Sequence, residues 1–285
     1  MIPIFIVSNV CKLGVRLFVL ALVSAPLLAA AQTSAPLAAP ASIIAEVQFK
    51  GYEGLAYELS SGKMLYKETH FIKYVKSEVA ERVVVYRCPN NEPFGRKQLE
   101  MRKSPLIPDF SFNDGRTGHT ESLKTEGGKL AISFRQSAKK SLKTEKIGLT
   151  AAMVADAGFD EFIRVNWASL RAGKSAPLNF VVPSQLDYLG FKVRYLSATT
   201  LDSKAASVFK LAPSGILSLF TSGLDVTYLD DDKSLRQFAG LSNIRDLDGE
   251  NYEVKIDFPL NLRQVYADQT AMQAARSVPL VTRCN

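Results

Sequence analysis

A histidine among acidic and basic residues is the first place in this chain where side chains could do chemistry. His119 lies in NDGRTGHTES, beside Asp114, Arg116 and Glu121. An imidazole near carboxylates can transfer protons close to neutral pH. A hydrolase or lyase acting through His119 and these acids is therefore one hypothesis. A single histidine in a polar loop is more often solvated, and for His70, in KETHFIKYV, we expect a surface or packing role.

The other patterns for catalysis or metal binding are incomplete. ASLRAGKS (168–175) has alanine where a phosphate-binding loop needs its first glycine. GLSNI (240–244) lacks the second glycine of a nucleophile elbow, and DLDGEN (246–251) lacks the later glutamate of a calcium loop. The two histidines are not at metal-ligand spacing. The sequence predicts no catalytic residue, no metal and no cofactor.

The first thirty-one residues read as an export signal. Lys12 and Arg16 are the only charges there, and an uncharged run ends in Ala29-Ala30-Ala31. That run is shorter than the roughly 20 residues of a spanning helix. We expect cleavage near Ala31 and a periplasmic location, with an uncleaved anchor as the alternative. The domains expected are a signal peptide (1–31), an Ala/Pro-rich linker (32–42) and a single β-rich domain (43–285).

Two cysteines remain after removal of such a signal, which contains Cys11. Cys88 lies in YRCPN and Cys284 in PLVTRCN. Paired thiols outside the cytoplasm usually form a disulfide. We expect a Cys88–Cys284 bond, with the sulfurs brought together by neighbouring strands, because each cysteine follows an apolar run and an arginine.

The charge is mildly basic, with 35 Lys+Arg against 28 Asp+Glu, a net charge of +7. Without Lys12 and Arg16 it is +5. Outside the cytoplasm the anionic partners are lipid headgroups and polysaccharide, and no basic–aromatic cluster indicates nucleic acid. The segment 135–146 has two interpretations, an edge strand protected by lysines or a patch that faces a membrane surface. Its lysines are Lys139, Lys140, Lys143 and Lys146.

Strands must position most of these residues, because alternation of apolar and polar residues dominates the chain. In KLAISFR, Leu130, Ile132 and Phe134 share one face, and YEVKIDF, FKVRYL and LDVTYLD repeat the pattern. Such strands are typical of an antiparallel sheet with one buried face. Turn residues separate them at 60–63, 113–115, 126–128, 230–232 and 246–249. About ten or more strands follow from this spacing.

One amphipathic helix interrupts the strands at about 153–172. Its apolar stripe is spaced for a helix, Asp156 is suited to cap its start and Gly173 follows its end. Shorter helices are expected at 214–223 and 267–277. A sheet with one apolar face needs a cover. The expected fold is mainly β (α+β), a curved antiparallel sheet or half-barrel covered by this helix. The residues expected to line a ligand site are Phe159, Phe162, Ile163 and Trp167.

The segment VTYLDDDKSLRQFAGLSN (226–243) carries a resemblance to known proteins. It has a strand ending in tyrosine, an acidic turn and a second strand with a basic-then-aromatic ending. It resembles hairpins of exported bacterial proteins of the lipoprotein-carrier class. FDEFIRVNW and FVVPSQLDYLGFKVR resemble segments of an uncharacterised envelope family of similar build. The carrier resemblance implies a half-barrel with a helical lid that shelters acyl chains.

The leading hypothesis is a non-enzymatic periplasmic protein with an envelope-related role. It would bind a lipid or another apolar ligand between the curved sheet and the helix of Trp167. The alternatives are an envelope assembly or scaffold protein without a pocket and the hydrolase or lyase that uses His119. An empty apolar cavity would favour the first hypothesis, a packed core the second, and a polar cleft at His119 the third.

Overall fold

The computed structural model of the chain describes residues 47–214, 223–266 and 269–285. Its strands are β1 (Val47–Glu58), β2 (Met64–Val75), β3 (Glu78–Arg87), β4 (Pro93–Glu100), β5 (Asp109–Asp114), β6 (Thr120–Glu126), β7 (Lys129–Arg135), β8 (Lys143–Gly148), β9 (Met153–Val154), β10 (Ala176–Val182), β11 (Asp187–Leu201), β12 (Lys204–Pro213), β13 (Leu224–Leu229), β14 (Leu235–Arg245), β15 (Asn251–Asp257) and β16 (Arg263–Tyr266). Its helices are α1 (Gly158–Arg171), α2 (Thr270–Ser277) and the short 3-10 helices η1 (Pro183–Gln185) and η3 (Leu260–Leu262).

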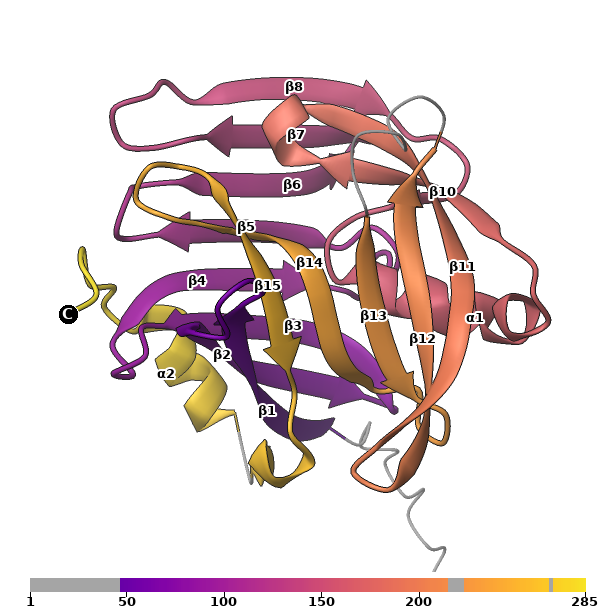
Figure 1. Cartoon of the computed structure of the whole chain (residues 1–285). Helices are drawn as coiled ribbons and strands as arrows, with labels where there is room; N and C mark the ends of the chain where they lie inside the picture. Colours follow the sequence, from indigo (N-terminus) through magenta and orange to yellow (C-terminus); the bar gives the residue numbers. More distant parts are fainter. Residues whose placement is uncertain (1–46, 215–222, 267–268) are drawn as a thin grey trace, which may run out of the picture. The chain divides into compact units, whose positions relative to one another are not determined.

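These strands form one curved sheet made of two antiparallel meanders. The first meander adds β2 to β8 outward from β1, and the second runs from β10 back to β15, which pairs with β1. β16 also pairs with β1, and the short β9 pairs in parallel with β10. In Figure 1 the orange strands β11–β13 cross the direction of the purple and magenta strands β2–β8, as expected for one strongly curled sheet. The predicted mainly β fold with a curved antiparallel sheet is confirmed.

The two outer strands of the sheet are neighbours in the sequence. β8 ends at Gly148 and β9 begins at Met153, so five peptide steps separate them. Five steps extend over at most roughly 18 Å. The sheet is therefore rolled until its two edges approach each other without pairing. The contacts of η1, after β10, with β6 and β7 close the same side.

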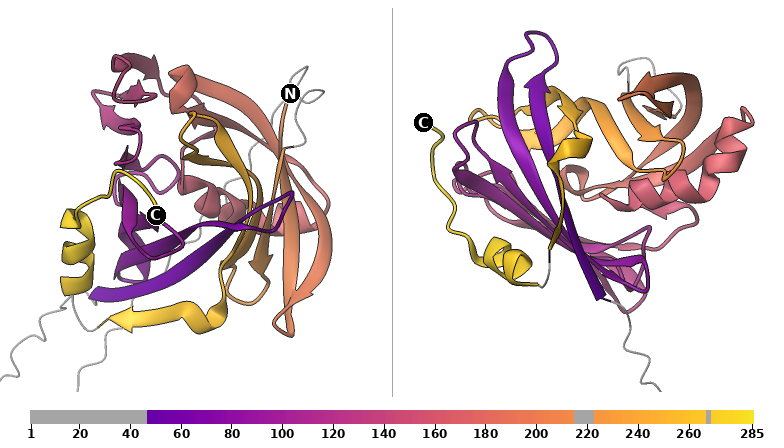
Figure 2. Two further views of the ribbon diagram at one scale, coloured as in Figure 1. Left: turned by 60° about the vertical axis from the view of Figure 1, so that its left-hand side comes forward. Right: turned by 90° about the horizontal axis from the view of Figure 1, so that it is seen from below.

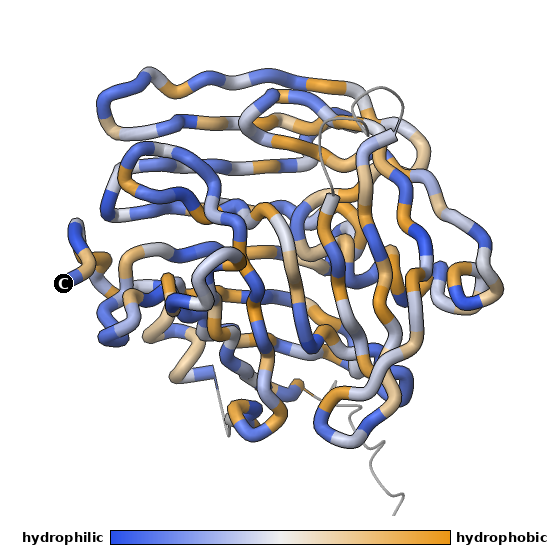
Figure 3. The backbone as a smooth tube through the Cα atoms, in the orientation of Figure 1, coloured by the Kyte–Doolittle hydropathy of each residue, from blue (hydrophilic) through white to orange (hydrophobic). Residues whose placement is uncertain are grey.

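Alternation along the strands sends one set of side chains into the roll. Leu130, Ile132 and Phe134 of β7 are buried, as are Val254 and Ile256 of β15. Figure 3 shows apolar and polar residues alternating along many of the strands. This division of faces is the one that the sequence predicts.

The predicted turns connect strands. Gly127 and Gly128 form the two-residue link between β6 and β7 and both have positive φ, which glycine adopts without strain. Gly249, in the turn between β14 and β15, also has a positive φ of 93°. The hairpin predicted at 226–243 is present as β13 and β14.

Helix α1 is shorter than the predicted span of 153–172. Met153 and Val154 form β9 instead, and the helix begins at Gly158. Asp156 does not cap it, because its carboxylate accepts a hydrogen bond from the adjacent Ala157 amide and forms an ion pair with Lys97. The buried stripe of α1 packs on the β10–β13 part of the sheet through Val193, Phe209, Leu211 and neighbouring apolar side chains. The helix therefore covers that part and not the whole sheet.

The second helix lies on the outer face of the first meander (Figure 2). Met272 and Ala275 of α2 pack against Phe71, Val83 and Val85 of β2 and β3. These side chains point away from the interior because their neighbours in sequence point into it. The helix confirms part of the predicted helix at 267–277. The predicted helix at 214–223, the signal peptide and the linker lie almost entirely outside the described residues.

A disulfide joins Cys88, just after β3, to Cys284, with Cα atoms 5.5 Å apart. The predicted pairing is confirmed. The segment after α2 is irregular and not a strand, so the expected pair of neighbouring strands is wrong. A hydrogen bond from the Val281 amide to the Pro93 carbonyl (2.8 Å) holds this segment beside the β3–β4 turn. In the ranges described above, no helix has the length and hydropathy needed to cross a membrane.

Candidate functional site

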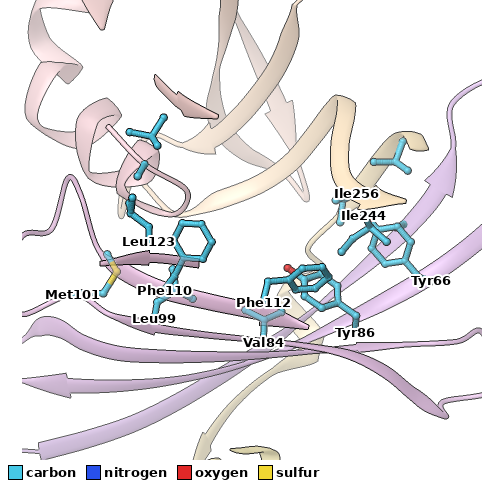
Figure 4. Packing of buried hydrophobic residues seen from close by; sticks show 14 of the residues in the cluster. Tyr66, Val84, Tyr86, Leu99, Met101, Phe110, Phe112, Leu123, Ile244 and Ile256 are labelled. Atoms are coloured by element: carbon cyan, nitrogen blue, oxygen red, sulfur yellow. The ribbon is translucent and has the colours of Figure 1, made fainter. Parts of the chain in front are cut away.

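A cavity of about 300 Å³ lies inside the roll, beside the start of α1. Its volume is at the lower end of the roughly 300–1,000 Å³ of small-molecule sites. Figure 4 shows Phe110 and Phe112 rising from the same face of β5 toward the interior. The apolar side chains that line the cavity come from both meanders and from α1: Val84, Leu99, Phe110, Phe159, Phe180, Leu211, Val226, Phe238, Ile256 and Phe258.

A row of polar and apolar side chains crosses the first meander next to the cavity. His70 on β2 is opposite Val84 on β3, which is opposite Lys97 on β4. Lys97 is opposite Phe112 on β5, which is opposite Glu121 on β6. Directly paired residues project from the same face of a sheet. The register therefore turns His70, Lys97 and Glu121 inward, and all three line the cavity.

Lys97 joins the sheet to the segment before α1. Its side chain is 4% exposed, and its ammonium group forms an ion pair with the Asp156 carboxylate. The ammonium nitrogen also lies 5.6 and 5.8 Å from the ring centroids of Phe110 and Phe112. A buried ammonium needs such partners, since burial without them costs several kcal/mol. The charge of Lys97 is compensated inside the protein.

His70 and Glu68 form a second buried pair, with Nε2 2.9 Å from the carboxylate oxygen. The imidazole stacks on the Tyr52 ring, with centroids 4.3 Å apart and planes at 16°. Burial lowers the pKa of His70 from 6.5 and outweighs the opposing effect of Glu68. The histidine is therefore neutral at neutral pH. Its Nδ1 is buried without a hydrogen-bond partner in the described part of the chain.

Arg82 and Asp160 connect β3 to the first turn of α1. The guanidinium Nη1 lies 3.6 Å from the Asp160 carboxylate, which is beyond hydrogen-bond distance. The other carboxylate oxygen of Asp160 accepts a 2.8 Å hydrogen bond from the Tyr228 hydroxyl on β13. Asp160 thus links both meanders to the helix, while Arg82 remains poorly paired.

The tyrosines of the cavity are protonated. Burial raises the pKa of Tyr52 to about 12. Burial also raises the pKa of Tyr66, Tyr86 and Tyr228 well above the ordinary value. These hydroxyls are therefore neutral; the Tyr228 hydroxyl donates to Asp160, and the Tyr66 hydroxyl is buried without a hydrogen-bond partner in the described residues. The site combines apolar walls, neutral donors and mostly paired charges, which is an arrangement for binding.

Of the four residues predicted to line a ligand site, only Phe159 lines the cavity. Phe162 and Ile163 are buried in the contact between α1 and the sheet. Trp167 is half-buried, with its ring centroid 5.0 Å from that of Phe209 and 6.4 Å from that of Tyr228. The cavity lies at the start of α1, and Trp167 is two turns further along the helix.

His119 is buried and not solvated, contrary to expectation. Its ring lies between Phe112 and Phe134, with centroids 5.6 and 5.2 Å away. Nδ1 is 2.8 Å from the Arg135 carbonyl oxygen and Nε2 is 3.1 Å from a Glu121 carboxylate oxygen. Both ring nitrogens are therefore occupied by partners, and the histidine holds the β5–β6 connection against β7.

The acids near His119 in sequence are divided in the structure. Asp114 forms a bidentate ion pair with Arg116, with distances of 3.1 and 2.7 Å. The Glu121 carboxylate contacts the His119 ring and lines the cavity, whereas Asp114 meets His119 only through a backbone hydrogen bond. Within the described ranges, no three His, Cys, Asp or Glu side chains are grouped as a metal site requires.

The predicted basic segment lies at one edge of the sheet. Lys139 and Lys140 are in the loop before β8, and Lys143 and Lys146 are on β8; all four are exposed. β8 pairs only with β7, so its other side is an open edge in the described structure. This placement fits an edge strand protected by lysines. Contact with a membrane surface stays a prediction.

Sequence reasoning missed the interior charges Glu68, Arg82 and Lys97. The signal was present in VAERVVVYR, where Arg82 occupies the same alternating positions as Ala80, Val84 and Tyr86. A charged residue in phase with an apolar face marks either a buried ion pair or a binding site. Following that phase along β2, β3 and β4 would have identified the polar side of the cavity.

Comparison with known proteins gives a remote likeness. No protein-family model matches the chain, and no curated protein matches it in sequence. Among solved structures, the chain is similar to a crystal structure described as a beta-barrel-like protein of domain of unknown function DUF1849 from Brucella abortus. The identity is 8%, the TM-score is 0.47, and the match covers 78% of this chain and 99% of that chain.

Proposed function

We propose that this chain is a non-enzymatic protein of the bacterial envelope that binds a lipid or another apolar ligand in the cavity beside α1. The observation that carries this proposal is the cavity of about 300 Å³ with apolar walls from both meanders. A void in a core costs stability in proportion to its size. A ligand that fills the cavity would recover the lost contacts.

An exported location is supported by the signal-like first thirty-one residues and by the Cys88–Cys284 disulfide. Disulfides persist in oxidising compartments such as the periplasm. The similarity of the 226–243 hairpin to carriers of lipoproteins supports an apolar ligand. The exposed lysines of the 139–146 segment would favour contact with anionic headgroups at the membrane surface.

An assembly or scaffold protein is the second candidate, and the open edge of β8 favours it. A partner can add a strand to such an edge. A hydrolase or lyase is the weaker candidate. His119, which it would use, has partners at both ring nitrogens and does not line the cavity.

Native mass spectrometry of the full chain purified from the periplasm tests the proposal, followed by solvent extraction of anything bound. We expect a bound mass that extraction releases as a lipid or other apolar molecule. Delipidated protein should then bind an alkyl-chain fluorophore. Absence of both a bound mass and fluorophore binding would remove the ligand-binding function.

A cavity-filling variant locates the binding. Val84→Phe adds volume to a cavity wall, whereas Val165→Phe adds the same group to the exposed side of α1. We expect Val84→Phe to weaken fluorophore binding by roughly tenfold or more, with a wild-type circular dichroism spectrum. Val165→Phe should bind like the wild type. Equal binding by both variants would place the ligand elsewhere.

A further inference from the structure

A second hollow of about 1,000 Å³ opens beside the cavity and is strongly basic. Six cationic side chains line it against three carboxylates, Glu78, Glu161 and Asp232. Two of these acids already have partners, since Glu161 pairs with Arg164 at 3.5 Å and Asp232 with Arg263 at 3.4 Å. The remaining cations are Lys50, Lys76, Arg82 and Arg102. The hollow therefore has an excess of positive charge.

Arg82 and Ala157 line both the apolar cavity and the basic hollow, so each space borders these two residues. Arg82 is 8% exposed, yet no described residue accepts a hydrogen bond from it, and its Nε is buried without a partner. Its one charged contact is the 3.6 Å approach to Asp160. A guanidinium has five N–H donors, and leaving a buried one unsatisfied is costly. An acceptor from outside the chain would remove that cost.

The other charges of the cavity do not compete for this role. Lys97 is paired with Asp156, and the Glu68 carboxylate is a hydrogen-bond acceptor for the neutral His70 ring, so neither is a free cation that could hold an anion. A cationic ligand would meet the positive hollow, and a wholly apolar ligand would leave Arg82 unsatisfied. The arrangement suits a molecule with an alkyl chain at one end and an anion at the other.

We propose that the ligand is an anionic single-chain amphiphile, with its alkyl chain in the apolar cavity and its anionic head against Arg82 in the basic hollow. This inference rests on the proposed function and specifies the ligand class. The cavity, at about 300 Å³, is at the small end of the roughly 300–1,000 Å³ of small-molecule sites, which favours one alkyl chain over two. A carboxylate or a phosphate monoester can each accept two hydrogen bonds from a guanidinium. A fatty acid and a lysophospholipid therefore share the required chemistry.

The test is isothermal titration calorimetry of the delipidated full chain with four amphiphiles that share a palmitoyl or hexadecyl chain. The probes are palmitate, lysophosphatidic acid, lysophosphatidylcholine and hexadecyltrimethylammonium, each below its micelle threshold. We expect the two anionic probes to bind roughly tenfold or more tightly than the zwitterionic and cationic ones. The tighter of the two anionic probes identifies the carboxylate or the phosphate as the preferred head.

Arg82→Gln should remove that preference while leaving lysophosphatidylcholine affinity within about twofold. Arg194→Gln, on an exposed position of β11, is the matched control and should keep the preference. If Arg82→Gln does not fold, Lys76→Gln with Arg102→Gln removes two exposed charges of the hollow and should weaken only the anionic probes.

The outcomes separate the two proposals. One outcome is that the protein binds the amphiphiles with no preference for the anionic ones. Another is that the preference survives both the Arg82 variant and the double variant. Either outcome would overturn the proposal of an anionic head group and leave the proposal of an apolar ligand in the cavity intact. Failure of all four probes to bind the wild type would overturn both.

Discussion

Loss of the Cys88–Cys284 disulfide should lower the stability of the protein without changing its fold. The two cysteines are 196 residues apart. For a closed loop of this length the chain-entropy model gives about 5 kcal/mol of stabilisation, as an upper figure. That is a large share of the roughly 5–15 kcal/mol by which domains are stable. The double variant Cys88→Ser/Cys284→Ser is the perturbation.

The folded state should change little, because α2 has its own contacts. Met272 and Ala275 remain packed on β2 and β3, and Arg276 remains paired with Glu81. Only the irregular segment after α2 loses an anchor. The effect therefore arises mainly in the unfolded chain, which gains freedom once the crosslink is absent.

Urea unfolding, followed by both circular dichroism and Trp167 fluorescence, measures the difference. With a urea m-value of about 3 kcal/mol/M, the midpoint should fall by roughly 1–2 M. A reducing agent should lower the wild-type midpoint to that of the double variant and leave the variant itself unchanged. That second result is the control for other effects of the reductant. A midpoint of the double variant within about 0.3 M of the oxidised wild type would refute the reasoning.

Three further predictions follow from the packing of single residues. Trp167→Ala should lower the free energy of unfolding by about 2–3 kcal/mol. This is less than the ~3–5 kcal/mol typical of buried large aromatic residues, because the Trp167 ring is half-buried. A loss above about 4 kcal/mol would contradict the half-buried position. Gly158→Ala should cost about 1–3 kcal/mol, because the added Cβ would lie 2.0 Å from the Leu106 carbonyl oxygen. Gly148→Ala, with open space around its Cβ position, is the control and should stay within about 0.5 kcal/mol. Burial lowers the pKa of His70 from 6.5 in the folded protein. As the pH falls, the histidine of the unfolded chain therefore becomes protonated at a higher pH than that of the folded protein. The free energy of unfolding should therefore decline as pH falls below about 6.5, and it should decline less steeply in His70→Gln. Urea titrations at pH 7 and 5 measure this difference. An equal decline in the wild type and the variant would contradict the lowered pKa of His70.

Turns that contain glycine and the acidic turn at 230–232 could be predicted from the sequence, whereas two other turns could not. EGG and DLDG mark positions where the backbone needs positive φ, and glycine supplies it. The turns at Lys76–Ser77 and Asp202–Ser203 also have positive φ, at 52°, 68°, 49° and 61°, but carry ordinary side chains. Their signal is weak because the flanking long strands impose these conformations.

The candidate site was the least predictable part. Alternation identified the inner face, and the apolar stripe identified α1, but neither reports how strongly the sheet curls. Curling decides which end of the helix meets the cavity, so Phe159 lines it and Trp167 does not. The disulfide needed only a count of cysteines and an oxidising compartment.

The buried charges on β3 and β4 have a structural role, which is to keep α1 at a distance from these two strands. A buried ion pair adds little stability over apolar residues of the same volume. The Lys97–Asp156 pair nevertheless ties the segment before α1 to the first meander, and Arg82 approaches Asp160 at 3.6 Å, while the apolar stripe of α1 packs on the second meander. Two apolar surfaces in this position could close on each other and fill the interior. Polar groups that must keep their partners fix the helix at a distance from β3 and β4, and the cavity lies in the space that this distance leaves.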